Sequence, residues 1–240
     1  MINKNSLSQC VGSVAQPKTL NRITSGLRNR AALINLIAAS TTFAVLVMWL
    51  DAPIIKIIHA QLKPTLIAFF GDVSGIANAN FFAISALSVY AASRVASVLP
   101  VPPRWRHLFK QAKDGSLLML LTLLTGGLIT LILKQVVARA RPSMLLEFDQ
   151  YGLATPFLGF PFNSFPSSHA FTAFAVACVL AHLIPRWRST LLLLAALTSL
   201  CRVLTLEHFP SDVLASAFIA AWCTRFWTSR PVGCGVRNLL

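Results

Sequence analysis

The stretch AALINLIAASTTFAVLVMWL, residues 31–50, contains no charged residue. A helix that crosses a bilayer needs about 20 predominantly apolar residues, so this stretch predicts a transmembrane helix. Five further stretches have a similar character, namely residues 79–99, 116–133, 168–184, 190–206 and 212–227. The sequence therefore predicts an all-α fold, an integral membrane bundle of six transmembrane helices.

The composition of the 240 residues agrees with a membrane protein and excludes several other classes. Apolar residues make up 55% of the chain and charged residues 12%, whereas about 25% of an ordinary soluble domain is charged. This apolar share excludes intrinsic disorder, and five cysteines are a sparse, odd number for a disulfide scaffold. The net charge of +14 would suit a nucleic-acid binder, but the charges lie between apolar runs. We therefore expect membrane lipid around the chain and no nucleic-acid partner.

The distribution of basic residues predicts the orientation of the bundle. The first 30 residues carry five basic residues and no acid and precede a full-length span, which indicates a retained cytoplasmic tail. With six crossings, fifteen of the 21 Lys and Arg residues and a single acid, Asp114, lie inside. The positive-inside rule therefore predicts that both termini are cytoplasmic. We expect a basic tail at 1–30, the membrane domain at 31–229 and a short tail at 230–240.

Between the first two spans, residues 52–70 combine several isoleucines with Lys56, His59 and Lys63. Apolar and basic residues mixed in this way are typical of a helix that lies in the membrane interface. We predict an interfacial helix on the outer face, either a plain connector or the border of a lipid entrance.

Three polar clusters interrupt the apolar pattern, and the predicted topology puts all three at the outer ends of helices. The first contains Lys134 and Arg141, followed by Pro142. If the third helix continues to Ala140, residues seven apart share a face, so Lys134 and Arg141 point the same way and Arg139 points elsewhere. Pro142 then marks the helix end. The alternative is that both cations merely extend to the interface, as Lys and Arg often do at helix ends.

The second cluster, Ser164 to His169, opens the fourth helix. Proline and serine favour a helix start, where unpaired backbone N–H groups can bind an anion. His169 stands where it can donate a proton to a group bound there. The alternative is that Ser167 and Ser168 only cap the helix.

The third cluster consists of Arg202, His208 and Asp212, around the end of the fifth helix. A carboxylate within reach of an imidazole can hold its tautomer and raise its basicity. A buried arginine at this depth is costly unless it meets an anion. The alternative is a structural pair between Arg202 and an acid, with His208 at the interface.

Together the clusters supply three cations, a helix start, two histidines and a carboxylate at one side of the membrane. This set suits a phosphate ester, because cations and N–H groups neutralise phosphate oxygens while one imidazole attacks phosphorus and another protonates the leaving oxygen. The sequence has no acidic cluster suited to Mg²⁺ and no Cys and His spacing typical of zinc sites. These absences disfavour a magnesium or a zinc site, and we expect no cofactor.

In order and spacing, the three clusters resemble the signature motifs of the type-2 phosphatidic acid phosphatase superfamily. The resemblance implies a metal-independent hydrolase in which His208 attacks phosphorus and forms a phosphohistidine. It also implies that Asp212 orients His208 and that His169 acts first as an acid and then as a base toward water. The implied ligands of the phosphate oxygens are Lys134, Arg141, Arg202, the hydroxyl of Ser167 and the amide of Ser168.

Two positions depart from the family pattern, which has glycine where Ser168 stands and serine where Cys201 stands. A side chain at Ser168 narrows the pocket and is strained if the position requires a positive φ. Cys201 keeps a small side chain with a weaker hydrogen bond. Neither change removes a catalytic group, so we expect an active enzyme.

The resemblance predicts an integral-membrane lipid phosphatase that acts on a phosphomonoester or diphosphate at the periplasmic face of a bacterial inner membrane. Four substrates stay open: undecaprenyl diphosphate, phosphatidylglycerophosphate, phosphatidic acid and a lipid A phosphate. The oligomeric state is not predicted. Two other functions also stay open, a phosphotransferase of the same fold that passes the phosphoryl group to a lipid hydroxyl, and a catalytically silent relative that binds phospholipid.

Overall fold

A computed structural model describes residues 34, 38, 40–100 and 102–230 of the chain. The predicted tail at 1–30 and most of the tail at 230–240 lie outside these residues, as does part of the first predicted span. The chain divides into two compact units, Met1–Ala44 and Val45–Leu240. The described residues of the first unit are helical.

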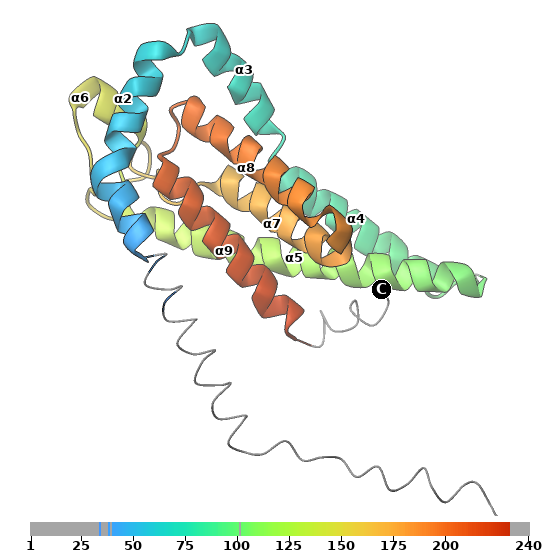
Figure 1. Ribbon diagram of the computed structural model, residues 1–240. Helices are drawn as coiled ribbons and strands as arrows, with labels where there is room; N and C mark the ends of the chain where they lie inside the picture. The colour runs from blue at the N-terminus through green and yellow to red at the C-terminus, as the bar shows by residue number, and fades with distance from the viewer. Residues whose placement is uncertain (1–33, 35–37, 39, 101, 231–240) are drawn as a thin grey trace, which may run out of the picture. The chain divides into compact units, whose positions relative to one another are not determined.

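The second unit consists of helices joined by short connections and one long loop. Within the described residues no β-strand forms, and the β pairing is limited to an isolated bridge between Arg139 and Leu153. The predicted all-α class is therefore confirmed for this part of the chain. The elements, labelled in Figure 1, are η2 (Leu46–Leu50, a π-helix), α2 (Asp51–Gln61), α3 (Pro64–Gly75), α4 (Ala79–Ala96), α5 (Pro103–Val137), α6 (Pro142–Phe148), α7 (Ser168–Leu183), η3 (Pro185–Trp187), α8 (Arg188–Leu204) and α9 (Pro210–Thr228).

Four of the described helices are long and apolar enough to cross a membrane. They are Ser40–Gln61, Pro64–Ala96, Trp105–Val137 and Pro185–Leu204, and α7 is a shorter apolar helix. The described residues thus contain helices that could span a membrane, as predicted, while the count of six remains a prediction.

The outer surface of α5 is apolar, as contact with lipid requires. Leu124, Leu128 and Leu131 recur at helical spacing, and each is more than half exposed. A row of exposed leucines is unfavourable in water but not in a bilayer. The surface of this helix therefore agrees with a membrane location.

α7 lies at the centre of the bundle and packs against α5, α8 and α9 (Figure 1). The main core joins Leu123 of α5 to Phe171 and Val179 of α7 and to Ala220 of α9. α5 and α7 approach each other closely at Gly126 of α5, where a Cβ atom would lie 2.3 Å from the ring of Phe171 in α7. Only glycine permits this approach, which brings the ends of α5 and α7 together.

The prediction of one helix over residues 52–70 is wrong, because the chain breaks between α2 and α3. Lys63 is extended (φ −70°, ψ 145°), as residues before proline usually are, and Pro64 then opens α3. Residues 52–61 belong to α2, which directly continues η2. A location in the membrane interface remains a prediction for these two helices.

α5 also differs from the predicted third helix at both ends. It begins at Pro103, so Arg106, Lys110 and Lys113, which are among the basic residues counted inside, lie on a helix and not in a loop between the second and third spans. It ends before Ala138, which adopts a left-handed conformation (φ 44°, ψ 51°). The predicted continuation to Ala140 is therefore wrong, and Lys134 and Arg141 do not share a helix face.

Candidate active site

The predicted site residues lie on the ends of four helices that meet at one end of the bundle. Lys134 is near the end of α5, His169 in the first turn of α7, Arg202 in the last turn of α8 and Asp212 in the first turn of α9. Because short connections join α7, α8 and α9, these helices alternate in direction. The start of α7, the end of α8 and the start of α9 therefore come together.

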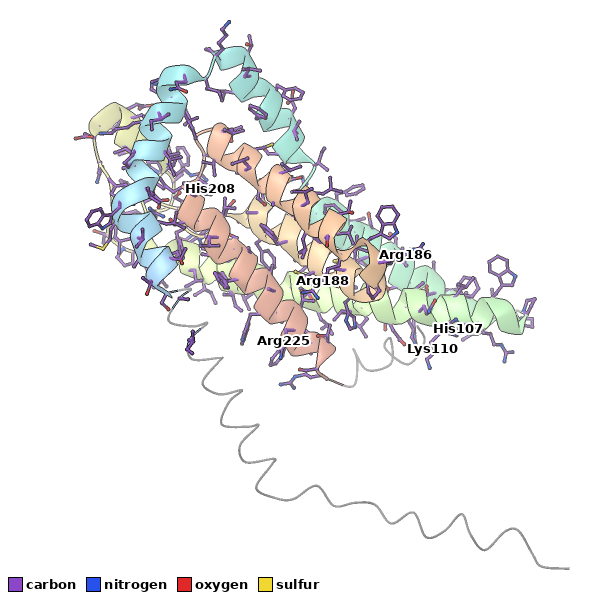
Figure 2. All side chains as sticks on the ribbon, in the orientation of Figure 1. His107, Lys110, Arg186, Arg188, His208 and Arg225 are labelled. Carbon is purple, nitrogen blue, oxygen red and sulfur yellow. The ribbon has the colours of Figure 1, made fainter. Side chains whose placement is uncertain are left out.

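Several basic residues lie at the other end of the same helices. Figure 2 shows His208 at one end of the bundle and Arg186, Arg188 and Arg225 at the opposite end. The helices thus separate the polar clusters from the basic connections, as the sequence predicts.

A hydrogen-bonded loop ends α5 and redirects Arg139 and Arg141. The N–H of Ala140 donates to the carbonyl of Gly152 at 3.0 Å, and the N–H of Ser164 donates to the carbonyl of Arg139 at 3.0 Å. These bonds satisfy backbone groups that a longer helix would have paired internally. They explain why the Arg139 side chain turns into the interior, a direction that regular helix geometry alone does not predict.

Asn163, which the sequence analysis did not identify, connects two of the predicted phosphate ligands. Lys134 Nζ donates to the Asn163 carbonyl at 2.7 Å, and Arg141 Nε donates to its Oδ1 atom at 2.9 Å. Charge-assisted hydrogen bonds of this kind hold cations in place. Lys134 and Arg141 therefore lie together although they share no helix face.

Glu207 joins the third cation to this group. Its Oε2 atom forms an ion pair with Arg141 Nη1 and lies 3.6 Å from Arg202 Nη2. Arg202 Nη1 also donates to the Ser74 hydroxyl at 3.1 Å. Lys134, Arg141 and Arg202 thus converge on one place, as an anion site requires.

His169 lies near the same group of charges. Besides burial, the electrostatic environment of this half-buried side chain is set by Arg202, Glu207, Lys134 and Arg141. Its imidazole is therefore beside the cations, where a proton donor to a bound ester is needed.

Ser167 is the N-cap of α7, and Ser168 is the first residue of the helix. The buried Ser167 hydroxyl accepts a hydrogen bond from the Ala170 amide at 3.4 Å, the ordinary role of a capping serine. Ser168 is not among the described residues with positive φ, so its side chain causes no strain of that kind. Its N–H belongs to the first turn, where the helix itself provides no acceptor.

His208 and Asp212 form a buried pair, 2% and 0% exposed. His208 Nδ1 lies 3.7 Å from Asp212 Oδ2, within ion-pair range but longer than a hydrogen bond. Within the described residues, His208 Nδ1 has no hydrogen-bond partner. Asp212 is thus close enough to stabilise positive charge on the imidazole.

Burial also keeps His208 unprotonated. Desolvation of the ring lowers the pKa of His208 to about 4, and the neighbouring Asp212 carboxylate offsets this only in part. The imidazole is therefore neutral near pH 7. A neutral imidazole has the lone pair that a nucleophile needs.

Arg139 has a structural role that the sequence analysis did not identify. Its side chain is 4% exposed, with Nη1 2.6 Å from Asp212 Oδ1 and Nη2 2.7 Å from Asp51 Oδ2. The hydroxyls of Ser211 and Tyr151 accept further hydrogen bonds at 2.7 and 2.8 Å. We call Asp51, Arg139 and Asp212 the buried ionic cluster.

One signal in the sequence does point to this cluster. Asp51 directly follows an apolar span, and a carboxylate at such a position is costly without a partner cation. The sequence cannot identify that partner, because a regular helix to Ala140 turns Arg139 away. The loop that ends α5 decides the pairing.

Asp212 also caps the start of α9. Its Oδ2 atom accepts hydrogen bonds from the Phe209 amide at 2.9 Å and the Ser164 hydroxyl at 2.6 Å. A carboxylate in this position satisfies an N–H that the helix leaves unpaired. Together with the ion pair to Arg139, these two hydrogen bonds hold the Asp212 carboxylate from three directions.

Residues 115–232 match the PAP2 superfamily, and this range contains every predicted site residue. These residues belong to the PAP2 superfamily. The resemblance of the three motifs to this family is thereby confirmed. The matched range contains α6, α7, α8 and α9 and most of α5.

Two relatives by sequence are lipid A 1-phosphatases. The protein of Rhizobium johnstonii is 36% identical over 102 residues, which cover 42% of this chain and 41% of the relative. The protein of Rhizobium etli is 35% identical over 118 residues, which cover 48% of this chain and 50% of the relative. The matched regions therefore span half the length of these two relatives or less.

Two solved structures share the fold. The crystal structure of Aquifex aeolicus LpxE matches with a TM-score of 0.53 and 22% identity, over 78% of this chain and 99% of that one. The PAP2-type phosphatidylglycerolphosphate phosphatase of Bacillus subtilis matches with a TM-score of 0.53 and 20% identity, over 80% and 95%. The helical arrangement is thus shared with these two proteins.

Proposed function

We propose that this protein is an integral-membrane lipid phosphate phosphatase that works through a phosphohistidine at His208. The observation that carries the proposal is the convergence of Lys134, Arg141 and Arg202 beside two histidines within a PAP2 domain. Three cations and an unpaired helix start suit the oxygens of a phosphate. A buried neutral imidazole suits the nucleophile.

The first chemical step is transfer of the phosphoryl group to the protein. Nδ1 of His208 faces Asp212, so we assign the attack on phosphorus to Nε2. The P–N bond forms as the P–O bond to the lipid breaks, and His169 donates a proton to the departing lipid oxygen. The Asp212 carboxylate stabilises the positive charge that develops on the His208 ring.

The second step returns His208 to its starting state. His169 accepts a proton from water, whose oxygen attacks phosphorus while the P–N bond breaks. Inorganic phosphate is released, and the three cations bind its oxygens in both steps. A lipid hydroxyl in place of water would make the enzyme a phosphotransferase.

Lipid A 1-phosphate is the first substrate to test, because both relatives by sequence are named for it. We expect purified protein to release phosphate from at least one of the four candidate lipids in excess EDTA. The reason is that cations and imidazoles perform the proposed chemistry without a metal. Radiolabelled substrate measures the result. Loss of activity on chelation, restored by Mg²⁺, would contradict metal independence, and label in a second lipid would indicate a phosphotransferase.

We further propose six spans, cytoplasmic termini and a periplasmic active site in a bacterial inner membrane. Support comes from the charge distribution, since Arg186, Arg188 and Arg225 lie at the end opposite His208. α2 and α3 would then lie near the outer headgroups. A reporter fused after Leu240 should be active only if it is a type that works in the cytoplasm. A reporter inserted near Tyr151 should be active only if it is a type that works outside the cytoplasm. A cytoplasmic signal near Tyr151 would reverse the orientation.

A further inference from the structure

Glu207 lies inside the proposed phosphate site, although its charge has the same sign as the substrate's. Its Oε2 atom pairs with Arg141 Nη1 and lies 3.6 Å from Arg202 Nη2, so two guanidinium groups converge on a single oxygen. A phosphate oxygen makes the same kind of contact with paired arginines. Resting on the proposed function, we infer that the Glu207 carboxylate occupies the position of a substrate phosphate oxygen and competes with the substrate.

The backbone holds Glu207 at this position. Leu206 adopts a positive φ of 58°, and the amides of Glu207 and His208 both donate to the Arg202 carbonyl at 3.2 Å. This tight turn after α8 fixes the residue directly before the nucleophile. The carboxylate is therefore kept near the anion site even when its side chain changes rotamer.

The side chain itself is able to leave. It is 41% exposed, whereas Asp212 is fully buried and bonded from three directions. An exposed carboxylate is rehydrated when its ion pairs break, so the cost of leaving is small. Glu207 is thus a displaceable anion, unlike the carboxylates of the buried ionic cluster.

Contacts other than those with Glu207 also hold the two arginines. Arg141 Nε donates to Asn163 Oδ1 at 2.9 Å, and Arg202 Nη1 donates to the Ser74 hydroxyl at 3.1 Å, and neither bond depends on Glu207. The anion site is therefore already organised when the carboxylate moves out. A competitor bound to an organised site lowers the apparent affinity for every other anion that needs the site.

The experiment measures binding of orthovanadate and inorganic phosphate to the purified full-length chain by titration calorimetry. Glu207→Gln removes the competing charge and should bind both anions about tenfold more tightly than the wild type, with little change in melting temperature. The matched control is Asp149→Asn, which removes the same charge from an exposed pair with Lys56 outside the site. This control should bind like the wild type.

Two outcomes would overturn the inference in different ways. If Glu207→Gln is folded but binds vanadate with unchanged affinity, Glu207 does not compete with the anion, and a lower affinity would show that it organises the arginines instead. The proposed function stands in both cases. If wild type and both variants are folded yet bind neither anion, there is no phosphate site for Glu207 to block. The proposed function then fails together with the inference.

Discussion

His208→Ala should have no measurable turnover and should form no acid-labile phosphoenzyme. The proposed P–N bond forms at this imidazole, which is buried, neutral near pH 7 and 3.7 Å from the Asp212 carboxylate. Single-turnover reactions with ³²P-labelled lipid and acid quenching measure both quantities. His59→Ala, at an exposed position of α2, is the matched control and should keep the wild-type rate.

His169→Ala should respond differently, because its proposed role is proton transfer. A positioned general acid contributes about 10²–10⁴-fold, so hydrolysis of a lipid phosphate should slow by that factor. The loss should shrink for p-nitrophenyl phosphate, whose leaving group departs without a proton. If His169→Ala forms no phosphoenzyme from this substrate while His208→Ala does, the two roles are exchanged. Wild-type rates in both variants would contradict the enzyme hypothesis.

Replacement of Arg139 by alanine should produce the largest loss of stability. The change leaves the fully buried carboxylates of Asp51 and Asp212 without their common cation. Breaking a buried pair by removing one partner typically costs roughly 3–5 kcal/mol, because an uncompensated charge stays inside. Thermal unfolding in detergent measures the change. Activity should fall as well, since Asp212 lies beside His208.

Two companion variants show whether burial causes the effect of Arg139→Ala. Lys56→Ala removes a cation from an exposed pair with Asp149, at 2.9 Å, and should cost less than about 1 kcal/mol. Asp51→Asn leaves Arg139 paired with Asp212 and should fall between the two. Equal stability of Arg139→Ala and Lys56→Ala would show that the buried ionic cluster contributes little.

The membrane class and most helix positions follow from the sequence, because they depend on local properties. A run of apolar residues forms a helix in a bilayer regardless of its neighbours, since every backbone group pairs within the helix. Residues 79–96 and 190–204 therefore lie in helices, as predicted. Helix ends are predicted less well: α5 stops before Ala138 because a loop far along the chain supplies its hydrogen bonds.

The residues proposed for catalysis are likewise visible in the sequence, because their types and spacing carry the chemistry. His169, Arg202 and His208 lie at helix ends that α7, α8 and α9 bring together. The tertiary structure alone decides which charged side chains form ion pairs with one another. Arg139 pairs with Asp51, 88 residues away in the chain, and Glu207 lies between two arginines. Such pairing depends on distances between separate elements and on the loss of water around each charge, and neither is encoded in the spacing of residues along one helix.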